Sequence, residues 1–458
     1  MDRAELERAA DDPLPPDGAR PTTFARGAAL TFATRFAMAL NSFFVGIIVA
    51  RHLGPAGLGI YTVLNAINSN AAQFGVAGPA AAATYYVARD RRWLAPTFAN
   101  AILYSFSIGG ALAVSILLWA IATPSFFGTI PPALLSLAVI AIPFQIFTLL
   151  ALNLFLAIGR IERYSLLDLL GQSALLLNAL LALALFQAGL MTLVFLNTLA
   201  VVATALFVAA LLWRQLDRHE RARWKPDLAL LGRMARYGAK YHALMIASTL
   251  VLRADLFIVN WLRGAAEAGI YGVASQMALL LLMLPNVIGS LLFPRIAAAQ
   301  DASGHMAATT SRNIAFIMFI ICLGSVPVSL LLPYAYGAEF RASVAQFWLL
   351  LPGAYLLGLE MVLVQHFVGL GLPRAIPLFW LATLGVNLAL NLLLVPRWGA
   401  LGAAASSTVS YAFIFFLVAL YFHRHTGLPF GEILLLRRRE LVRLIGSARQ
   451  RLFSLAKA

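Results

Sequence analysis

Long apolar stretches alternate with short polar ones along the whole chain, and each apolar stretch is long enough to cross a lipid bilayer. An α-helix rises about 1.5 Å per residue, so about 20 apolar residues span the hydrocarbon core. We predict twelve membrane-spanning helices, approximately at residues 24–49, 60–86, 97–121, 133–158, 164–187, 190–213, 238–262, 269–293, 313–333, 343–369, 375–395 and 400–422. The expected fold class is therefore an all-α polytopic membrane protein.

The composition supports a membrane protein and excludes an ordinary soluble one. Of the 458 residues, 61% are hydrophobic and 12% are charged, whereas soluble domains carry about 45–50% apolar and about 25% charged residues. The net charge of +15 is also found in nucleic-acid-binding proteins. Here the basic residues lie at the ends of predicted spans, so we expect no nucleic-acid partner.

The basic residues are distributed unequally between the two sides of the predicted membrane. With twelve spans, 28 of the 34 lysines and arginines fall on the side that holds both termini, and four fall on the other side. Cytoplasmic loops of membrane proteins carry an excess of lysine and arginine. We therefore expect both termini to be cytoplasmic.

A repeated pattern of glycines divides the chain into two halves. Four residues of the first inter-span turn reappear 210 positions later, namely Gly54, Gly59, Ile60 and Tyr61 as Gly264, Gly269, Ile270 and Tyr271. Two further matches lie at nearly the same offset, Phe155–Gly159 with Phe367–Gly371 and Gly189 with Gly399. Repeats at one offset indicate two homologous bundles of six helices, related by a pseudo-two-fold axis along the membrane normal.

The flanking and linking segments are polar and give the predicted domain boundaries. Residues 1–22 are rich in proline and acidic residues and are expected to be a disordered cytoplasmic tail. The predicted order is then an N-terminal bundle (23–213), a basic cytoplasmic linker (214–237), a C-terminal bundle (238–422) and a basic amphipathic tail (423–458). The last segment is expected to lie on the anionic inner leaflet, which makes membrane lipids a partner.

Several ionisable residues lie within predicted spans, and the clearest cases are Arg35, Arg253, Asp255 and Glu360. A charge at mid-membrane costs at least about 2.5–3.5 kcal/mol, so such groups usually face a bundle interior or a wet cavity. Arg35 and Arg253 can contact an anionic substrate group, and Asp255 and Glu360 can couple transport to an ion. The alternative in each case is a structural pair between helices. The spacing of Arg253 and Asp255 places them on opposed flanks of one helix, so they are not expected to pair with each other.

Two groups of side-chain amides follow helical faces. Asn65, Asn68 and Gln73 lie in the second span, and Asn387 and Asn391 lie one turn apart in the eleventh. Such residues can hydrogen-bond sugar hydroxyls in a substrate cavity. They can equally hold helices together, and the sequence leaves both interpretations open.

Several activities lack the residues that they would need. The chain has no Gly-x-x-x-x-Gly-Lys-Ser/Thr loop for ATP and no cluster of histidine, cysteine and carboxylate residues with metal-ligand spacing. No predicted loop is large enough for a glycosyl-transfer site. We therefore expect a transporter and not an enzyme, with no metal or organic cofactor.

The order of several motifs resembles a known family. These motifs are residues 50–61 (Ala-Arg-His-Leu-Gly-Pro-Ala-Gly-Leu-Gly-Ile-Tyr), 252–258 (Leu-Arg-Ala-Asp-Leu-Phe-Ile), 269–275 (Gly-Ile-Tyr-Gly-Val-Ala-Ser), 367–374, 387–396 and 398–404. Together they look like the Wzx-type lipid-linked oligosaccharide flippases, within the multidrug/oligosaccharidyl-lipid/polysaccharide exporter superfamily. The resemblance covers residues 24 to 422.

The resemblance implies a two-lobed protein of the bacterial inner membrane that moves an undecaprenyl-diphosphate-linked oligosaccharide to the outer leaflet. O-antigen, capsule and exopolysaccharide assembly all use this step, and other polysaccharide-assembly proteins are possible partners. Cationic residues such as Arg35 and Arg253 would receive the diphosphate, and an ion gradient or the membrane potential would drive transport. The alternatives are a cation-coupled multidrug exporter of the same superfamily, a membrane-embedded glycan polymerase or ligase, and an assembly scaffold.

Overall fold

The computed structural model describes residues 21–76, 79–128, 130–299 and 301–434, and within these ranges the chain forms helices joined by short turns. The first half contains α2 (Pro21–Val76), α3 (Pro79–Arg89), η1 (Arg91–Trp93), α4 (Leu94–Ala122), α5 (Pro124–Phe127), α6 (Pro132–Val139), α7 (Ala141–Ala157), α8 (Ile161–Ala179), η2 (Leu180–Leu185), α9 (Leu190–Trp213) and α10 (Arg218–Ala222). The second half contains α11 (Leu228–Arg263), α12 (Ala265–Leu281), α13 (Met283–Ala299), α14 (His305–Ser329), α15 (Leu332–Tyr336), η3 (Ala338–Arg341), α16 (Ala342–Gly369), α17 (Ala375–Trp398), α18 (Ala400–Thr426) and α19 (Phe430–Leu434).

The long helices account for twelve membrane crossings. Within the described residues, 11 helices are long and apolar enough to cross a membrane, and the first of them, Ala33–Val76, has 44 residues. At 1.5 Å per residue this segment would be about 66 Å long, roughly twice the hydrocarbon thickness. The backbone breaks at Gly54 (φ 67°, ψ −173°), so α2 supplies two crossings. The predicted fold class, about twelve spans in two bundles, is confirmed.

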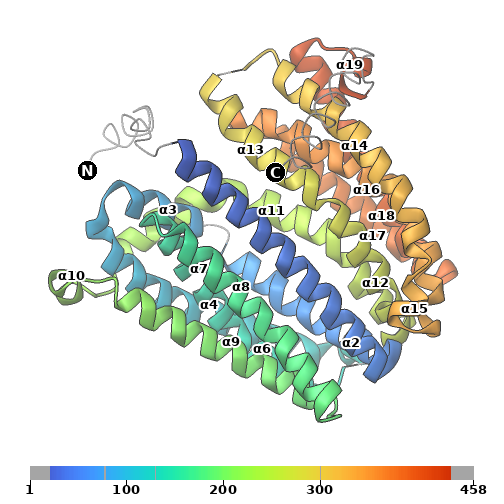
Figure 1. The fold of residues 1–458 in the computed structure, drawn as a ribbon, viewed down its shortest axis with the longest axis horizontal. Helices are drawn as coiled ribbons and strands as arrows, with labels where there is room; N and C mark the ends of the chain where they lie inside the picture. The colour runs from blue at the N-terminus through green and yellow to red at the C-terminus, as the bar shows by residue number, and fades with distance from the viewer. Residues whose placement is uncertain (1–20, 77–78, 129, 300, 435–458) are drawn as a thin grey trace, which may run out of the picture.

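The two halves form separate lobes that meet along α2. In Figure 1 the helices α4 and α6–α9 lie at the lower left, and α13, α14 and α16–α18 lie at the upper right. Helix α2 packs against α8 of its own half and against α12 of the other half. The contact between α2 and α12 is therefore the main connection between the lobes.

The predicted repeat is visible in the backbone. Gly54 and Gly264 both have positive φ and extended ψ, at 67° and −173° and at 90° and 171°. Gly159 and Gly371 also have positive φ, and each ends a helix with the same bond, Arg160 N–H to the Phe155 carbonyl (2.8 Å) and Leu372 N–H to the Phe367 carbonyl (2.7 Å). Equal backbone conformations at equivalent positions show that the halves are related by pseudo-two-fold symmetry.

The lobes touch through two equivalent glycines at this symmetry axis. A Cβ atom on Gly59 would lie 1.8 Å from the carbonyl oxygen of Ala265, and one on Gly269 would lie 2.1 Å from the carbonyl oxygen of Pro55. Ala265 and Pro55 occupy equivalent positions in the repeat, so each half makes the same contact with the other. Only glycine permits this approach, because any side chain would overlap the facing backbone.

Two charged side chains hold helix ends on the same side of the protein as these glycines. Arg51 donates hydrogen bonds to the carbonyl oxygens of Ala335 (2.7 Å) and Tyr334, which places α15 beside the break at Gly54 in α2. Glu267 pairs with Arg263 at 2.9 Å and accepts a hydrogen bond from the backbone N–H of Ala400 at 2.6 Å. Both contacts satisfy backbone groups at helix ends. They lie at the end of the molecule where Gly59 and Gly269 bring the lobes together, which we call the closed end.

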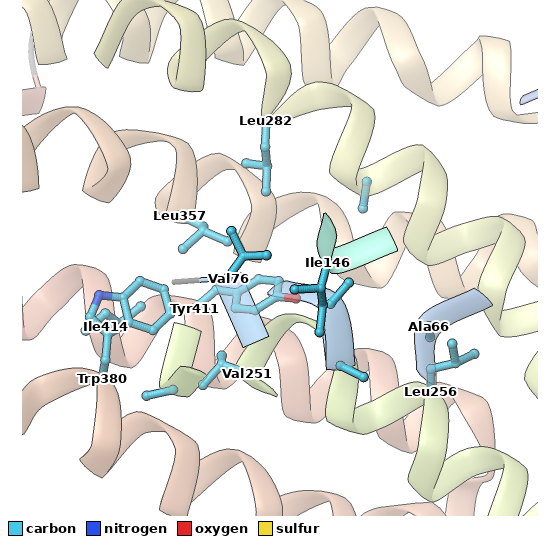
Figure 2. Close-up of a cluster of buried hydrophobic side chains, with 14 of the residues drawn as sticks. Ala66, Val76, Ile146, Val251, Leu256, Leu282, Leu357, Trp380, Tyr411 and Ile414 are labelled. Atoms are coloured by element: carbon cyan, nitrogen blue, oxygen red, sulfur yellow. The ribbon is translucent and has the colours of Figure 1, made fainter. Parts of the chain in front are cut away.

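Buried apolar side chains of the two halves form one large cluster, and a smaller second cluster includes Val49 and Leu58 on either side of the break in α2. Figure 2 labels members of the large cluster from both halves, among them Val76 and Ile146 of the first and Val251 and Ile414 of the second, and all four are buried. Large apolar side chains also remain exposed on the outside, for example Leu118, Ile121 and Leu323. In a protein that spans a membrane these exposed residues face lipid, so the apolar surface is expected.

Some predicted segments differ from the structure or lie outside it. Helix α11 begins at Leu228, ten residues before the predicted span, because the Asp227 side chain caps it by accepting a bond from Leu230 N–H at 2.9 Å. Residues 214–237 therefore contain α10 and the start of α11. The predicted tail at 1–22 lies almost entirely outside the described residues, as does the predicted amphipathic tail beyond residue 434.

The glycine contact gives a test of how the lobes are joined. We expect Gly59→Ala to destabilise the protein by about 1–3 kcal/mol, because the added methyl group overlaps the Ala265 carbonyl and overpacking costs this much. The measurement is thermal unfolding of the purified protein in detergent. Gly324→Ala on α14 is the matched control, since its Cβ would meet nothing within 4 Å. Equal melting temperatures for the two variants would contradict the proposed contact.

Candidate functional site

A cavity of about 540 Å³ lies between the two lobes. The first half lines it with α2, α6, α7, α8 and α9, and the second half lines it with α11, α12 and the start of α13. Its polar lining residues are Arg35, Ser42, Tyr61, Thr62, Asn65, Asn68, Ser69, Gln145, Gln172, Asn197, Thr198, Arg253, Ser275 and Gln276. The described lining thus contains two arginines and several amides but no aspartate or glutamate.

Arg35 projects into the cavity from the first half of α2. Its side chain is exposed, and its guanidinium Nη2 donates to the hydroxyl of Tyr164 on α8 at 3.2 Å. Asp168 lies one turn further along α8 and interacts electrostatically with Arg35. Because only one weak hydrogen bond engages the guanidinium within the described residues, its remaining donors can meet an anion in the cavity.

Arg253 and Asp255 lie on α11 and point in different directions, as their spacing predicts. Arg253 lines the cavity, whereas Asp255 is 1% exposed and faces the interior of the second lobe. The Asp255 carboxylate accepts hydrogen bonds from the hydroxyl of Tyr271, from Ser407 Oγ (2.7 Å) and from Leu256 N–H (2.7 Å). Asp255 therefore joins α11 to α12 and α18 and does not contact the cavity.

The amides of the second span separate into two groups. Asn65 and Asn68 line the cavity, and Asn68 Nδ2 also donates to the carbonyl oxygen of Ala138 on α6 at 3.0 Å. Gln73 is exposed but is not among the lining residues. Five residues separate Gln73 from Asn68, and at about 100° per residue this turns Gln73 well away from the face that Asn68 occupies.

Asn387 and Asn391 are buried within the second lobe, away from the cavity. Asn387 Nδ2 donates to Ser410 Oγ on α18 at 3.2 Å, and Asn391 Nδ2 donates to the side chain of Asn387 at 3.1 Å. In this structure these two residues hold α17 against α18. The sequence leaves two interpretations of this pair open, sugar binding and helix packing. The observed contacts are those of helix packing.

Glu360 is also buried in the second lobe, on α16, and is 1% exposed. The side chain of Trp380 on α17 hydrogen-bonds the carboxyl group, while the Oε1 atom has no hydrogen-bond partner among the described residues. A buried carboxyl oxygen without a donor is unusual, because such groups are nearly always satisfied. It leaves a position at which a proton or a cation can bind.

Four lining residues with side-chain amides were not singled out from the sequence: Gln145, Gln172, Asn197 and Gln276. Asn197 receives a hydrogen bond from Asn178 Nδ2 at 3.1 Å and so connects α8 with α9. Each of the three glutamines lies within an apolar span. That position is the only sequence signal that could have found them, since an amide in a span needs either a partner or water.

Sequence comparison finds similarity to proteins of polysaccharide assembly. The profile of a family described as polysaccharide biosynthesis protein matches residues 48–342. The "Putative O-antigen transporter" of Shigella flexneri is 28% identical over 173 residues, which make up 36% of this chain and 40% of that protein. The matched region thus spans two fifths of the length of that relative.

Structure comparison finds the same two-lobed fold in solved transporters. The lipid II flippase MurJ, in an inward closed conformation, superposes with a TM-score of 0.73 at 11% identity, covering 88% of this chain and 89% of that one. A multidrug resistance MATE transporter of the MOP superfamily, in an inward-facing conformation, gives 0.68 at 16% identity, covering 87% and 98%. The superpositions show that the fold is shared, and at identities this low they show the fold alone.

The contacts of Asp255 give a test of its structural role. We expect Asp255→Ala to lower stability by about 1–3 kcal/mol for each buried hydroxyl that loses its acceptor, namely those of Tyr271 and Ser407. Asp255→Asn keeps one acceptor oxygen and should cost less. Thermal unfolding in detergent measures both effects. A variant Asp255→Ala that melts with the wild type would show that the carboxylate does not hold these helices.

Proposed function

Because the chain belongs to the polysaccharide biosynthesis protein family, whose profile matches residues 48–342, we propose that it transports a lipid-linked oligosaccharide. The substrate is an undecaprenyl-diphosphate-linked oligosaccharide, which moves from the inner to the outer leaflet of the bacterial inner membrane. The product serves the assembly of O-antigen, capsule or exopolysaccharide by other proteins. In this proposal the chain is a transporter without enzymatic activity.

The observation that carries the proposal is the charge of the cavity. Arg35 enters it from the first lobe and Arg253 from the second, and the described lining contains no acidic residue. Guanidinium groups bind phosphate oxygens through paired, charge-assisted hydrogen bonds. A diphosphate between the lobes would therefore be held from both sides, whereas a cationic drug would meet two like charges. The cavity does not favour the multidrug exporter.

The comparisons support the same class of substrate. One relative is named as an O-antigen transporter, and one protein of similar fold is named as a lipid II flippase. The family description itself refers to polysaccharide biosynthesis. None of the three names the glycan that this chain would carry.

The direction of transport follows from the charge distribution and the closed end. With both termini cytoplasmic, the turns at Gly54 and Gly264 lie on the outer side, so the lobes are closed toward the outside. The cavity would then receive substrate from the inner leaflet. Transport requires the contact between Gly59 and Gly269 to open while the inner ends of the lobes close, which is alternating access by rocking of two repeats.

Two buried acids are the candidates for coupling to an ion gradient or to the membrane potential. Glu360 is the stronger candidate, because its Oε1 atom has no partner among the described residues and can take up a proton or a cation. Asp255 accepts three hydrogen bonds from three structural groups, so a change in its charge would loosen α11 from α12 and α18. Either event would change the relative stability of two arrangements of the second lobe.

The role of the arginines can be tested in cells. A deletion strain should accumulate lipid-linked oligosaccharide on the inner leaflet, and the wild-type gene should clear it. We expect Arg35→Ala and Arg253→Ala to slow clearance by about tenfold to a hundredfold, the equivalent of one lost hydrogen bond to a charged group. The measurement is the amount of lipid-linked oligosaccharide in each leaflet at matched membrane expression.

The matched control is Arg397→Ala, an arginine on the outer end of α17 that does not line the cavity. It should clear the lipid at the wild-type rate. The proposal fails if deletion leaves both leaflets unchanged, and it fails in favour of an exporter if drug sensitivity changes instead.

The role of Glu360 can be tested with the purified protein in liposomes. Glu360→Gln keeps the shape of the side chain and an acceptor for Trp380 but cannot take up a proton. We expect its transport rate under an imposed ion gradient to fall to the rate without a gradient. Glu162→Gln, at an exposed acid on α8, should respond like the wild type. An unchanged gradient response in Glu360→Gln would exclude Glu360 from coupling.

A further inference from the structure

Three glutamines face the cavity from three different helices. Gln145 lies on α7, Gln172 on α8 and Gln276 on α12. Each side chain is half-buried, and none of the three has a hydrogen bond to another group in the part of the chain that the structure describes. An amide has two donors and two acceptor positions, so these residues bring a large unused hydrogen-bonding capacity into the cavity.

The asparagines that line the same cavity differ from the glutamines in their contacts. Asn65 bonds to Tyr61, Asn68 to the carbonyl of Ala138, and Asn197 to Asn178. The bonds of Asn68 and Asn197 join neighbouring helices, and Asn65 is engaged within α2. The glutamines make no such bond within the described residues, so their amides are available to the contents of the cavity.

Gln276 also reaches across the boundary between the lobes. Its Oε1 atom lies 3.6 Å from the position of a Cβ atom on Gly46 of α2, and the hydroxyl of Tyr336 lies 3.2 Å from that position. Tyr336 is 1% exposed, and its hydroxyl has no described hydrogen-bond partner. Arg35 is eleven residues from Gly46 on the same helix, about 16 Å along its axis. Gln276 and Arg35 thus lie at different depths in the cavity.

We propose that Gln145, Gln172 and Gln276 form the glycan-binding part of the cavity, separate from the two arginines that hold the diphosphate. This inference rests on the proposed function and adds the chemistry of the sugar. Amides pair with hydroxyl and acetamido groups, which both donate and accept. The described lining offers no carboxylate for an ammonium group, so it does not favour a glycan segment that carries a positive charge.

The test compares two lipids on one protein. The full chain in lipid nanodiscs is titrated with lipid-linked oligosaccharide extracted from the membranes of the source strain, and separately with undecaprenyl diphosphate. We expect the triple variant Gln145→Leu, Gln172→Leu, Gln276→Leu to lose at least about tenfold in affinity for the glycan-bearing lipid. Its affinity for undecaprenyl diphosphate should not change. Each single variant should show a smaller loss of the same kind.

The control is Gln365→Leu on α16, whose amide donates to the Met361 carbonyl of its own helix at 3.2 Å and which does not line the cavity. It should bind both lipids like the wild type. Retained binding of undecaprenyl diphosphate shows that a variant is folded. If the triple variant misfolds and loses both lipids, the three single variants decide the question.

The outcomes separate this inference from the proposed function. Wild-type protein that binds neither lipid would overturn both. Wild-type protein that prefers the glycan-bearing lipid, with all glutamine variants keeping that preference, would overturn only the role of the glutamines. Variants that lose both lipids in equal measure while remaining folded would also overturn it, because the amides would then bind the shared diphosphate.

Discussion

The contact between Gly59 and Gly269 is the constraint on which the arrangement of the lobes depends. Lipid is as apolar as the helix surfaces, so burial of apolar area gives little drive for helices to associate within a membrane. Close packing of backbones supplies that drive instead, and it requires residues without side chains. Gly59 contacts the backbone of Ala265, and Gly269 contacts the backbone of Pro55. These two equivalent contacts fix how closely the lobes approach each other. The cavity exists where the helices diverge from this point.

The backbone groups freed at the closed end explain the charged residues found there. Helix ends leave unpaired N–H and C=O groups, which are costly near the hydrocarbon region. Arg51 satisfies carbonyl groups of α15, and Glu267 satisfies the N–H group that begins α18. The Arg51 contact joins the two halves, whereas the Glu267 contacts lie within the second half. Separating the lobes would therefore break the first and leave the second in place.

The sequence predicted the framework of the protein better than the orientation of its side chains. Repeated glycines were informative because positive φ and close backbone contact both demand glycine, and Gly54 and Gly264 indeed share one conformation. Asn387 and Asn391 were ambiguous because a polar face of a helix can meet a cavity or another helix, and α18 lies against it. Gln276 was missed because its role depends on which face of α12 meets α2, a fact of tertiary packing.

The chemistry of the two lobes is asymmetric although their fold is symmetric. At the repeat offset of 210, the position equivalent to Arg35 is Met245, and the positions equivalent to Arg253 and Asp255 are Phe43 and Val45. Each lobe thus carries one cavity arginine at a position where the other lobe has an apolar residue. In the proposed transport cycle, rocking of the lobes would change the distance between these arginines, so a bound diphosphate would interact differently with the two arrangements. Such a difference is what allows a ligand to shift a conformational equilibrium.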